Sequence, residues 1–134
     1  MASISAIEGI GPVYSEKLAT AGIKTTERLL KDGASRKGRR EIAKATGIDE
    51  KKILRWVNMS DLFRIKGVGE EYSDLLEAAG VDTVKELRNR NSENLTKKME
   101  EVNAEKKLVR SLPNLEKVQD WVAQAKEMEP MVTY

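Results

Sequence analysis

Two short glycine turns are the segments of this chain whose residue types and spacing suit a ligand. The first is Gly9-Ile10-Gly11, and Gly67-Val68-Gly69 repeats it 58 residues later. Glycine has no side chain, so its backbone N–H can come within hydrogen-bonding distance of a ligand. A helix that begins directly after such a turn adds unpaired N–H groups and the positive end of its dipole. Each turn is therefore predicted to fit a phosphate oxygen.

The two turns lie inside a longer repeat. The segment IEGIGPVYSEKLATAGIKT, residues 7–25, returns as IKGVGEEYSDLLEAAGVDT, residues 65–83, with the glycines, Tyr, Ser, Leu and Thr in register. Helical spacing follows each turn and stops at Gly22 or Gly80, which we expect in a left-handed conformation. Thr25 and Thr83 then cap the next helix. Each copy is thus predicted to form a helix, a tight turn and a second helix.

The rest of the chain also has helical spacing, and no segment alternates as a strand would. Trp56 and Trp121 lie in apolar stripes at matching places in the repeat, so we expect them in the core, with Tyr14 and Tyr72 packed behind the turns. In the first half, the further predicted helices are a short one within 3–9 capped by Ser3 or Ser5, 26–32 closed by Gly33, 35–46 ended by Gly47, and 50–58 capped by Asp49. In the second half, they are one capped by Ser60, 84–90, and 114–128 after a break at Pro113.

Composition limits the chemistry that the chain can perform. It has 134 residues with no cysteine and no histidine, which excludes disulfides, thiolate nucleophiles, Ser-His triads and the usual zinc ligands. The acidic groups in 70–74 and 100–105 lack the ligand spacing of a calcium loop. We therefore expect no metal, no cofactor and no enzymatic activity.

Charge and hydropathy indicate where the chain would act. Residues 1–64 carry 13 Lys or Arg and 8 Asp or Glu, whereas residues 65–134 carry 11 and 14. The first half should therefore make most of any contact with an anionic polymer. No apolar run is long enough to cross a bilayer, and the first residues lack the basic region and apolar core of a secretory signal. We therefore expect a cytoplasmic protein without a membrane partner.

These residues resemble a known motif. Ile-Glu-Gly-Ile-Gly and Ile-Lys-Gly-Val-Gly, each followed by Ala-Gly-Ile or Ala-Gly-Val, look like the helix-hairpin-helix motifs of DNA repair enzymes, ligases and polymerases. The resemblance covers residues 7–30 and 65–87. The tandem arrangement, with a Trp-Val helix after each motif, is similar to a family of small proteins known only as a domain of unknown function. The resemblance implies an all-α fold of two helix-hairpin-helix (SAM-like) units, which we expect to pack in one compact body. The repeat places the units at residues 1–59 and 60–129. Residues 130–134 form a tail that either frays or contacts a partner.

The resemblance also implies phosphate contacts at named positions. They would be the backbone N–H groups of Gly9 and Gly11 and of Gly67 and Gly69, with Ile10 and Val68 tucked between the helices. Such contacts read the sugar-phosphate backbone and are independent of base sequence. DNA-binding members usually have Lys or Arg just after the second glycine. Here Pro12 and Val13 follow the first turn, and Glu70 and Glu71 follow the second. Each like-charge pair costs on the order of 1 kcal/mol at a few ångströms in water, so the second hairpin is interpreted as structural.

A basic cluster adds the main candidate side chains. The segment SRKGRR places four cations within five residues, and three of them share one helix face, where they can straddle adjacent phosphates. A solvated helix face and an acidic protein partner are the alternatives. The candidate nucleic-acid-binding side chains are Arg36, Lys37, Arg39 and Arg40, with Lys17, Lys24 and Arg28 near the first hairpin.

The function predicted from these observations is a non-catalytic module that binds the backbone of nucleic acid, with DNA favoured. The alternative is a protein-interaction or scaffold domain in which both hairpins only pack helices, as Glu70, Glu71 and the acidic second half indicate. A metal-dependent nuclease is a third hypothesis that depends on carboxylates alone. DNA against RNA, the oligomeric state and the pathway stay open.

Overall fold

The computed structural model describes residues 3–134, and this part of the chain is all-α. It contains eight α-helices and one short 3-10 helix, and no strand forms within it, although Ser3 and Thr25 make an isolated antiparallel bridge. No helix within these residues is both long and apolar enough to span a membrane. The elements are η1 (Ile4–Ala6), α1 (Pro12–Thr20), α2 (Thr26–Gly33), α3 (Arg36–Thr46), α4 (Glu50–Leu62), α5 (Glu70–Ala78), α6 (Val84–Arg88), α7 (Ser92–Lys106) and α8 (Leu115–Glu127).

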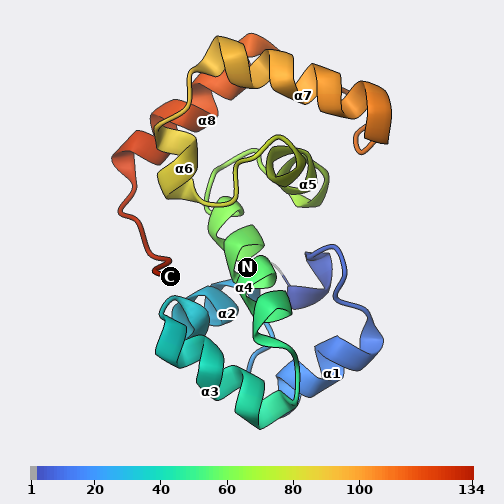
Figure 1. Cartoon of the computed structure of the whole chain (residues 1–134), viewed down its shortest axis with the longest axis vertical. Helices are drawn as coiled ribbons and strands as arrows, with labels where there is room; N and C mark the ends of the chain where they lie inside the picture. Colours follow the sequence, from blue (N-terminus) through green and yellow to red (C-terminus); the bar gives the residue numbers. More distant parts are fainter. Residues whose placement is uncertain (1–2) are drawn as a thin grey trace. The chain divides into compact units, whose positions relative to one another are not determined.

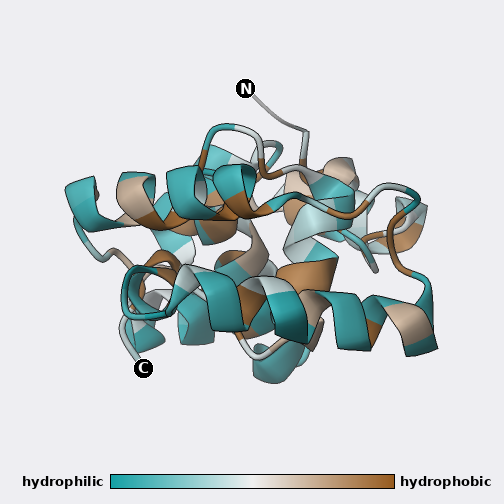
Figure 2. Cartoon of the chain, turned by 90° about the horizontal axis from the view of Figure 1, so that it is seen from above, coloured by the Kyte–Doolittle hydropathy of each residue, from teal (hydrophilic) through white to brown (hydrophobic). Residues whose placement is uncertain are grey.

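The chain divides into two compact units. The first comprises Met1–Asp61 together with Met131–Tyr134, and the second comprises Leu62–Pro130. Figure 1 labels α1 to α4 in the first unit and α5 to α8 in the second. In Figure 2 most of the helical ribbon is hydrophilic and brown residues interrupt it, as expected of amphipathic helices.

Local capping accounts for the helices of the first unit. The hydroxyl of Thr25 accepts from the N–H of Arg28 at 3.1 Å, and the hydroxyl of Ser35 accepts from the N–H of Gly38 at 3.0 Å. Gly22 and Gly47 adopt the left-handed conformation that follows a helix. These caps confirm the predicted starts of α2 and α3, and these glycines confirm the predicted ends of α1 and α3. Helix α3 packs against both α1 and α2.

The prediction that Gly33 stops α2 as a left-handed glycine is wrong. It is the last residue of α2 and is not left-handed; a Cβ on it would lie 2.6 Å from Cγ2 of Val57. Close packing of α2 against α4 therefore excludes a side chain at this position.

The last residues of the chain belong to the first unit. Val132 is buried, and the N–H of Thr133 donates to the carbonyl of Ala34 at 2.8 Å. The sequence left open whether this segment frays or contacts a partner. Residues 131–134 instead pack on the corner between α2 and α3. From here on, the tail means these four residues and no longer includes Pro130.

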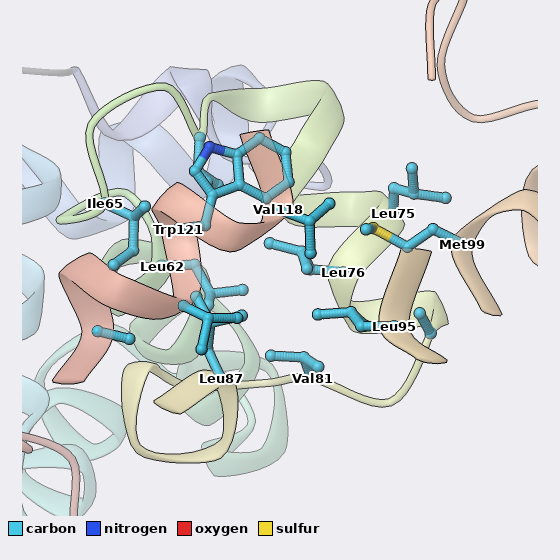
Figure 3. Packing of buried hydrophobic residues seen from close by; sticks show 14 of the residues in the cluster. Leu62, Ile65, Leu75, Leu76, Val81, Leu87, Leu95, Met99, Val118 and Trp121 are labelled. Carbon is cyan, nitrogen blue, oxygen red and sulfur yellow. The ribbon is translucent and has the colours of Figure 1, made fainter. Parts of the chain in front are cut away.

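The second unit has a continuous apolar core. Helix α8 packs against α6 and α7, and α7 also packs against α5. Figure 3 shows Leu76, Leu87 and Val118 pointing into the same interior, and all three are inaccessible to solvent. Trp121 in α8 is only 2% exposed, as the sequence predicted for both tryptophans. This core holds α5, the helix that follows the second turn.

The predicted helix start at Ser60 is wrong. Ser60 does not begin a new helix; it lies inside α4 and its hydroxyl donates to the carbonyl of Trp56 at 2.9 Å. Before the predicted break at Pro113, α7 ends at Lys106, where Lys107 is left-handed and the side-chain amide of Asn103 bonds both the N–H and the carbonyl of Val109. The side chain of Asn103 thus fixes the backbone that follows α7.

Candidate nucleic-acid interface

The two glycine turns have matching backbone geometry. Gly9 and Gly67 have φ values of 95° and 98°, a region that residues with a side chain rarely adopt. Gly11 and Gly69 have φ values of −85° and −108°, and they are the N-cap residues of α1 and α5. The first glycine of each turn is therefore required by the backbone, and the second is not.

The turns present several N–H groups without an acceptor. Within residues 3–134, no hydrogen bond is donated by the backbone N–H of Gly9, Gly11, Gly67 or Gly69. Neither Gly11 nor Gly69 can cap its helix with a side chain. All four glycines are exposed. The arrangement can therefore accept an anionic oxygen at the start of α1 and of α5.

An aromatic pair and a lysine lie behind each turn. The rings of Tyr14 and Trp56 are 5.1 Å apart at 59°, and Lys52 lies over the Tyr14 ring at 5.9 Å. The corresponding group in the second unit is Tyr72, Trp121 and Lys117, with ring centroids 5.2 Å apart at 53° and the lysine at 6.0 Å. Ile10 and Val68 are each 5% exposed. The side chains of Ile10 and Val68 are therefore both buried within their units.

Arg55 is a turn residue that the sequence reasoning missed. Its Nη1 donates to the carbonyl of Glu8 at 3.1 Å, and a Cβ on Gly9 would lie 3.3 Å from the same atom. Arg55 thus brings a positive charge to the first turn, and Lys52 adds a second one over the ring of Tyr14. The repeat contained a signal for the lysine, because Lys52 precedes Trp56 by four residues and Lys117 precedes Trp121 by four.

The second glycine turn has a different side-chain partner from the first and is followed by negative charges. The side-chain amide of Gln124 accepts from the N–H of Lys66 at 2.8 Å and donates to its carbonyl at 3.0 Å. Glu70 and Glu71 are exposed in the first turn of α5. Their carboxylates oppose an anion at this position.

Three of the four cations of the basic cluster, residues 36–40, are exposed. Arg36, Lys37 and Arg40 lie on the surface of α3, whereas Arg39 is 4% exposed. The guanidinium of Arg39 donates to the carbonyls of Gly33, Ala34 and Thr133 at 2.7 to 3.0 Å. Burial is the main cause of a lowered pKa for Arg39. Arg39 is therefore occupied in holding the tail, and the accessible cluster consists of the other three cations.

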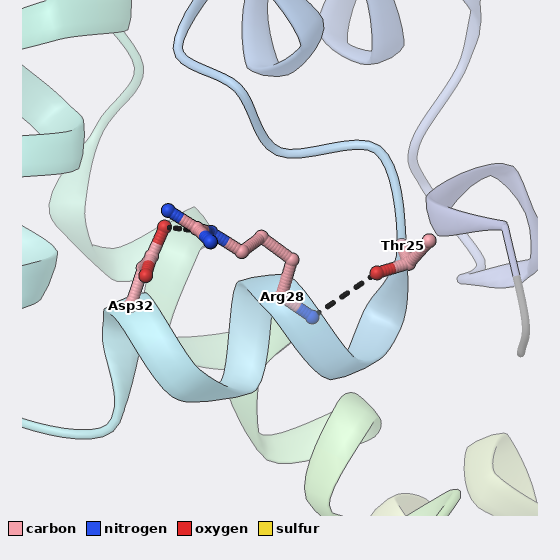
Figure 4. A network of polar contacts seen from close by, with 3 residues as sticks. All are labelled: Thr25, Arg28 and Asp32. Atoms are coloured by element: carbon pink, nitrogen blue, oxygen red, sulfur yellow. Dashed lines mark hydrogen bonds and ion pairs between the residues drawn. The ribbon is translucent and has the colours of Figure 1, made fainter.

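The remaining candidate cations lie away from the first turn or are paired. Arg28 makes an ion pair with Asp32, with Nε 2.9 Å from Oδ2, and Figure 4 shows this pair beside the cap from Thr25. Lys17 is exposed in the last turn of α1, and Lys24 is exposed between α1 and α2. The structure thus does not gather these three cations at the turn.

An open cavity of about 490 Å³ lies beside the basic cluster in the first unit. Both charge signs line it, so it has no clear preference for an anion. Its lining residues are Arg36, Arg39, Asp49, Glu50, Lys51, Leu54 and Tyr134.

Carboxylates gather near the start of α6 in the second unit. Burial raises the pKa of Asp82, and the nearby Glu86 and Glu77 raise it further. Within the part of the chain that the structure describes, no three carboxylates are grouped to hold a metal ion.

Comparisons with known proteins place the chain in a family. No curated protein and no solved structure matches it. A family described as "Domain of unknown function (DUF4332)" matches residues 8–128, which is most of the chain. The chain therefore belongs to this family.

Proposed function

We propose that the chain is a non-catalytic module that binds the phosphate backbone of nucleic acid, with DNA favoured. In this proposal each glycine turn is a helix-hairpin-helix turn, and the first turn, residues 9–11, is the one that binds. The contacts would be made to phosphate oxygens, so binding would be independent of base sequence.

One observation carries this proposal: α1 and α5 begin at a glycine that the fold does not require. The other helices whose caps are described use a side chain, from Thr25, Ser35, Thr83, Asn91 and Asn114. Gly11 and Gly69 have ordinary φ values, and nothing lies within 4 Å of a Cβ built on either. A capping side chain would fit there and would stabilise the helix. Its absence at both equivalent positions leaves the N–H groups open to an external oxyanion.

Charge favours the first turn over the second. Arg55 lies at the first turn, and Arg36, Lys37 and Arg40 add an exposed basic surface on α3 of the same unit. The second turn is followed by Glu70 and Glu71. Binding to a polyanion should therefore depend on the first unit and weaken as salt is added.

Fluorescence polarisation of labelled mixed-sequence duplex and single-stranded DNA at two salt concentrations tests this function. We expect salt-sensitive binding at micromolar protein, and similar affinity for unrelated sequences. Gly11→Ala should weaken binding about tenfold or more, since it places a methyl group where the oxyanion would approach. Gly69→Ala makes the same change in the acidic turn and should leave affinity unchanged. Absence of salt-sensitive binding would exclude the function.

A second candidate is a protein-interaction domain in which both turns only pack helices. Exposed apolar residues of the second unit favour it, since Leu112 is 42% and Leu115 is 36% exposed on either side of Pro113. Binding that persists when Arg36, Lys37 and Arg40 are replaced by Ala, and that is lost in Leu112→Ser/Leu115→Ser, would favour this candidate.

A further inference from the structure

The indole N–H of Trp56 is a polar group for which the fold provides no acceptor. Trp56 is 2% exposed, and within residues 3–134 it takes part in hydrogen bonds through its carbonyl and not through Nε1. Nor is this nitrogen enclosed without a partner, so the N–H keeps a path to solvent. An N–H that reaches solvent can exchange its water for a stronger acceptor, and a charged oxygen forms a stronger hydrogen bond than a neutral one.

The position of this nitrogen connects it to the first turn. A Cβ built on Gly9 would lie 3.7 Å from Nε1 of Trp56 and 3.3 Å from Nη1 of Arg55. The missing side chain of Gly9 therefore lets both donors approach the backbone of the turn. The indole nitrogen and the guanidinium therefore lie beside Gly9, two residues before the N-cap Gly11.

We propose that the Trp56 indole N–H donates a hydrogen bond to the phosphate oxygen bound in the first turn. This inference depends on the proposed function and adds a side-chain donor to its backbone contacts. Trp, unlike Phe or Tyr, supplies a donor that has no charge and no acceptor capacity, which suits an oxyanion.

The second unit supplies a matched internal control. Trp121 is also 2% exposed, packs on Tyr72 as Trp56 packs on Tyr14, and has its Nε1 3.2 Å from a Cβ built on Gly67. The two units differ at the position after the turn, where Glu70 and Glu71 repel an anion. The Trp121 indole should therefore not bind phosphate in the unmodified chain.

The experiment follows the two indole signals in proton–nitrogen NMR spectra of the intact labelled chain. Through-space contacts to the ring of Tyr14 or Tyr72 assign each signal, so no core variant is needed. On titration with a mixed-sequence duplex at low salt, the Trp56 indole proton should shift downfield with saturation, and its exchange with water should slow. The Trp121 signal should stay in place, and Glu70→Gln/Glu71→Gln should make it respond as well.

The outcomes separate this inference from the proposed function. If polarisation shows salt-sensitive binding while the Trp56 indole neither shifts nor exchanges more slowly, the indole contact is wrong and the function stands. A shift without slower exchange also overturns the contact, because it reports only a change in surroundings. If the duplex does not bind at all, both proposals fail.

Discussion

Nη2 of Arg39 donates to the carbonyl of Thr133 at 2.7 Å, so a buried arginine of α3 holds the last residues of the chain. The same guanidinium donates to the carbonyls of Gly33 and Ala34. Arg39 therefore joins the end of α2, the start of α3 and the tail. This role explains why one cation of the basic cluster is absent from the surface.

Arg39→Ala is expected to lower the free energy of unfolding of the first unit by about 1–3 kcal/mol, because it leaves buried carbonyls without a donor. Urea unfolding followed by the Trp56 indole signal measures this unit specifically. Arg40→Ala removes the same charge from an exposed position of α3 and should change stability by about 0.5 kcal/mol or less. Equal losses in the two variants would contradict the assigned role.

Gly9→Ala and Gly11→Ala should separate the two glycines of the first turn. Gly9 has a φ of 95° and is close to Arg55, so Ala there should destabilise the unit by about 1–2 kcal/mol or more. Gly11 has an extended backbone and open space, so Ala there should cost about 1 kcal/mol through poorer capping. Thermal unfolding and polarisation on the same samples check the pair. Greater stability loss in Gly11→Ala would contradict the geometry.

Asp82 should make the stability of the second unit depend on pH. Its pKa in the folded chain is raised, so its stabilising contribution is fully present below its ordinary pKa of 3.8 and is lost as pH rises through the raised pKa. Asp82→Asn, which mimics the neutral carboxyl, should raise the urea midpoint at neutral pH and have little effect below pH 3.8. Glu100→Gln, on the exposed side of α7, is the control. A lower midpoint for Asp82→Asn at neutral pH would contradict the assignment.

The three exposed cations of the basic cluster should contribute to the salt dependence of DNA binding. Replacing Arg36, Lys37 and Arg40 with Ala should weaken binding uniformly across sequences and reduce the slope of log affinity against log salt by about one per lost contact. The matched control removes three exposed charges of the second unit, from Lys97, Lys106 and Lys126. An equal effect of both triple variants would show that net charge, and not this surface, controls binding.

Local chemistry allowed much of the fold to be predicted from the sequence. Thr25, Ser35 and Thr83 accept the hydrogen bonds expected of N-caps, and Gly22 and Gly80 are left-handed as expected. These signals act within a few residues of each other, so they do not need the rest of the chain. The repeat likewise predicted that both tryptophans would be buried at equivalent positions.

The candidate surface was decided by contacts between residues far apart in the sequence. Spacing placed Arg39 with Arg36 and Arg40 on one helix face, but only packing decided that Arg39 would be buried beneath Thr133. The approach of Arg55 to Glu8 also joins distant segments. A sequence pattern determines which residues share a face of a helix, since helical geometry is local. Only the tertiary structure determines what covers that face, because burial and hydrogen-bond partners depend on the whole unit.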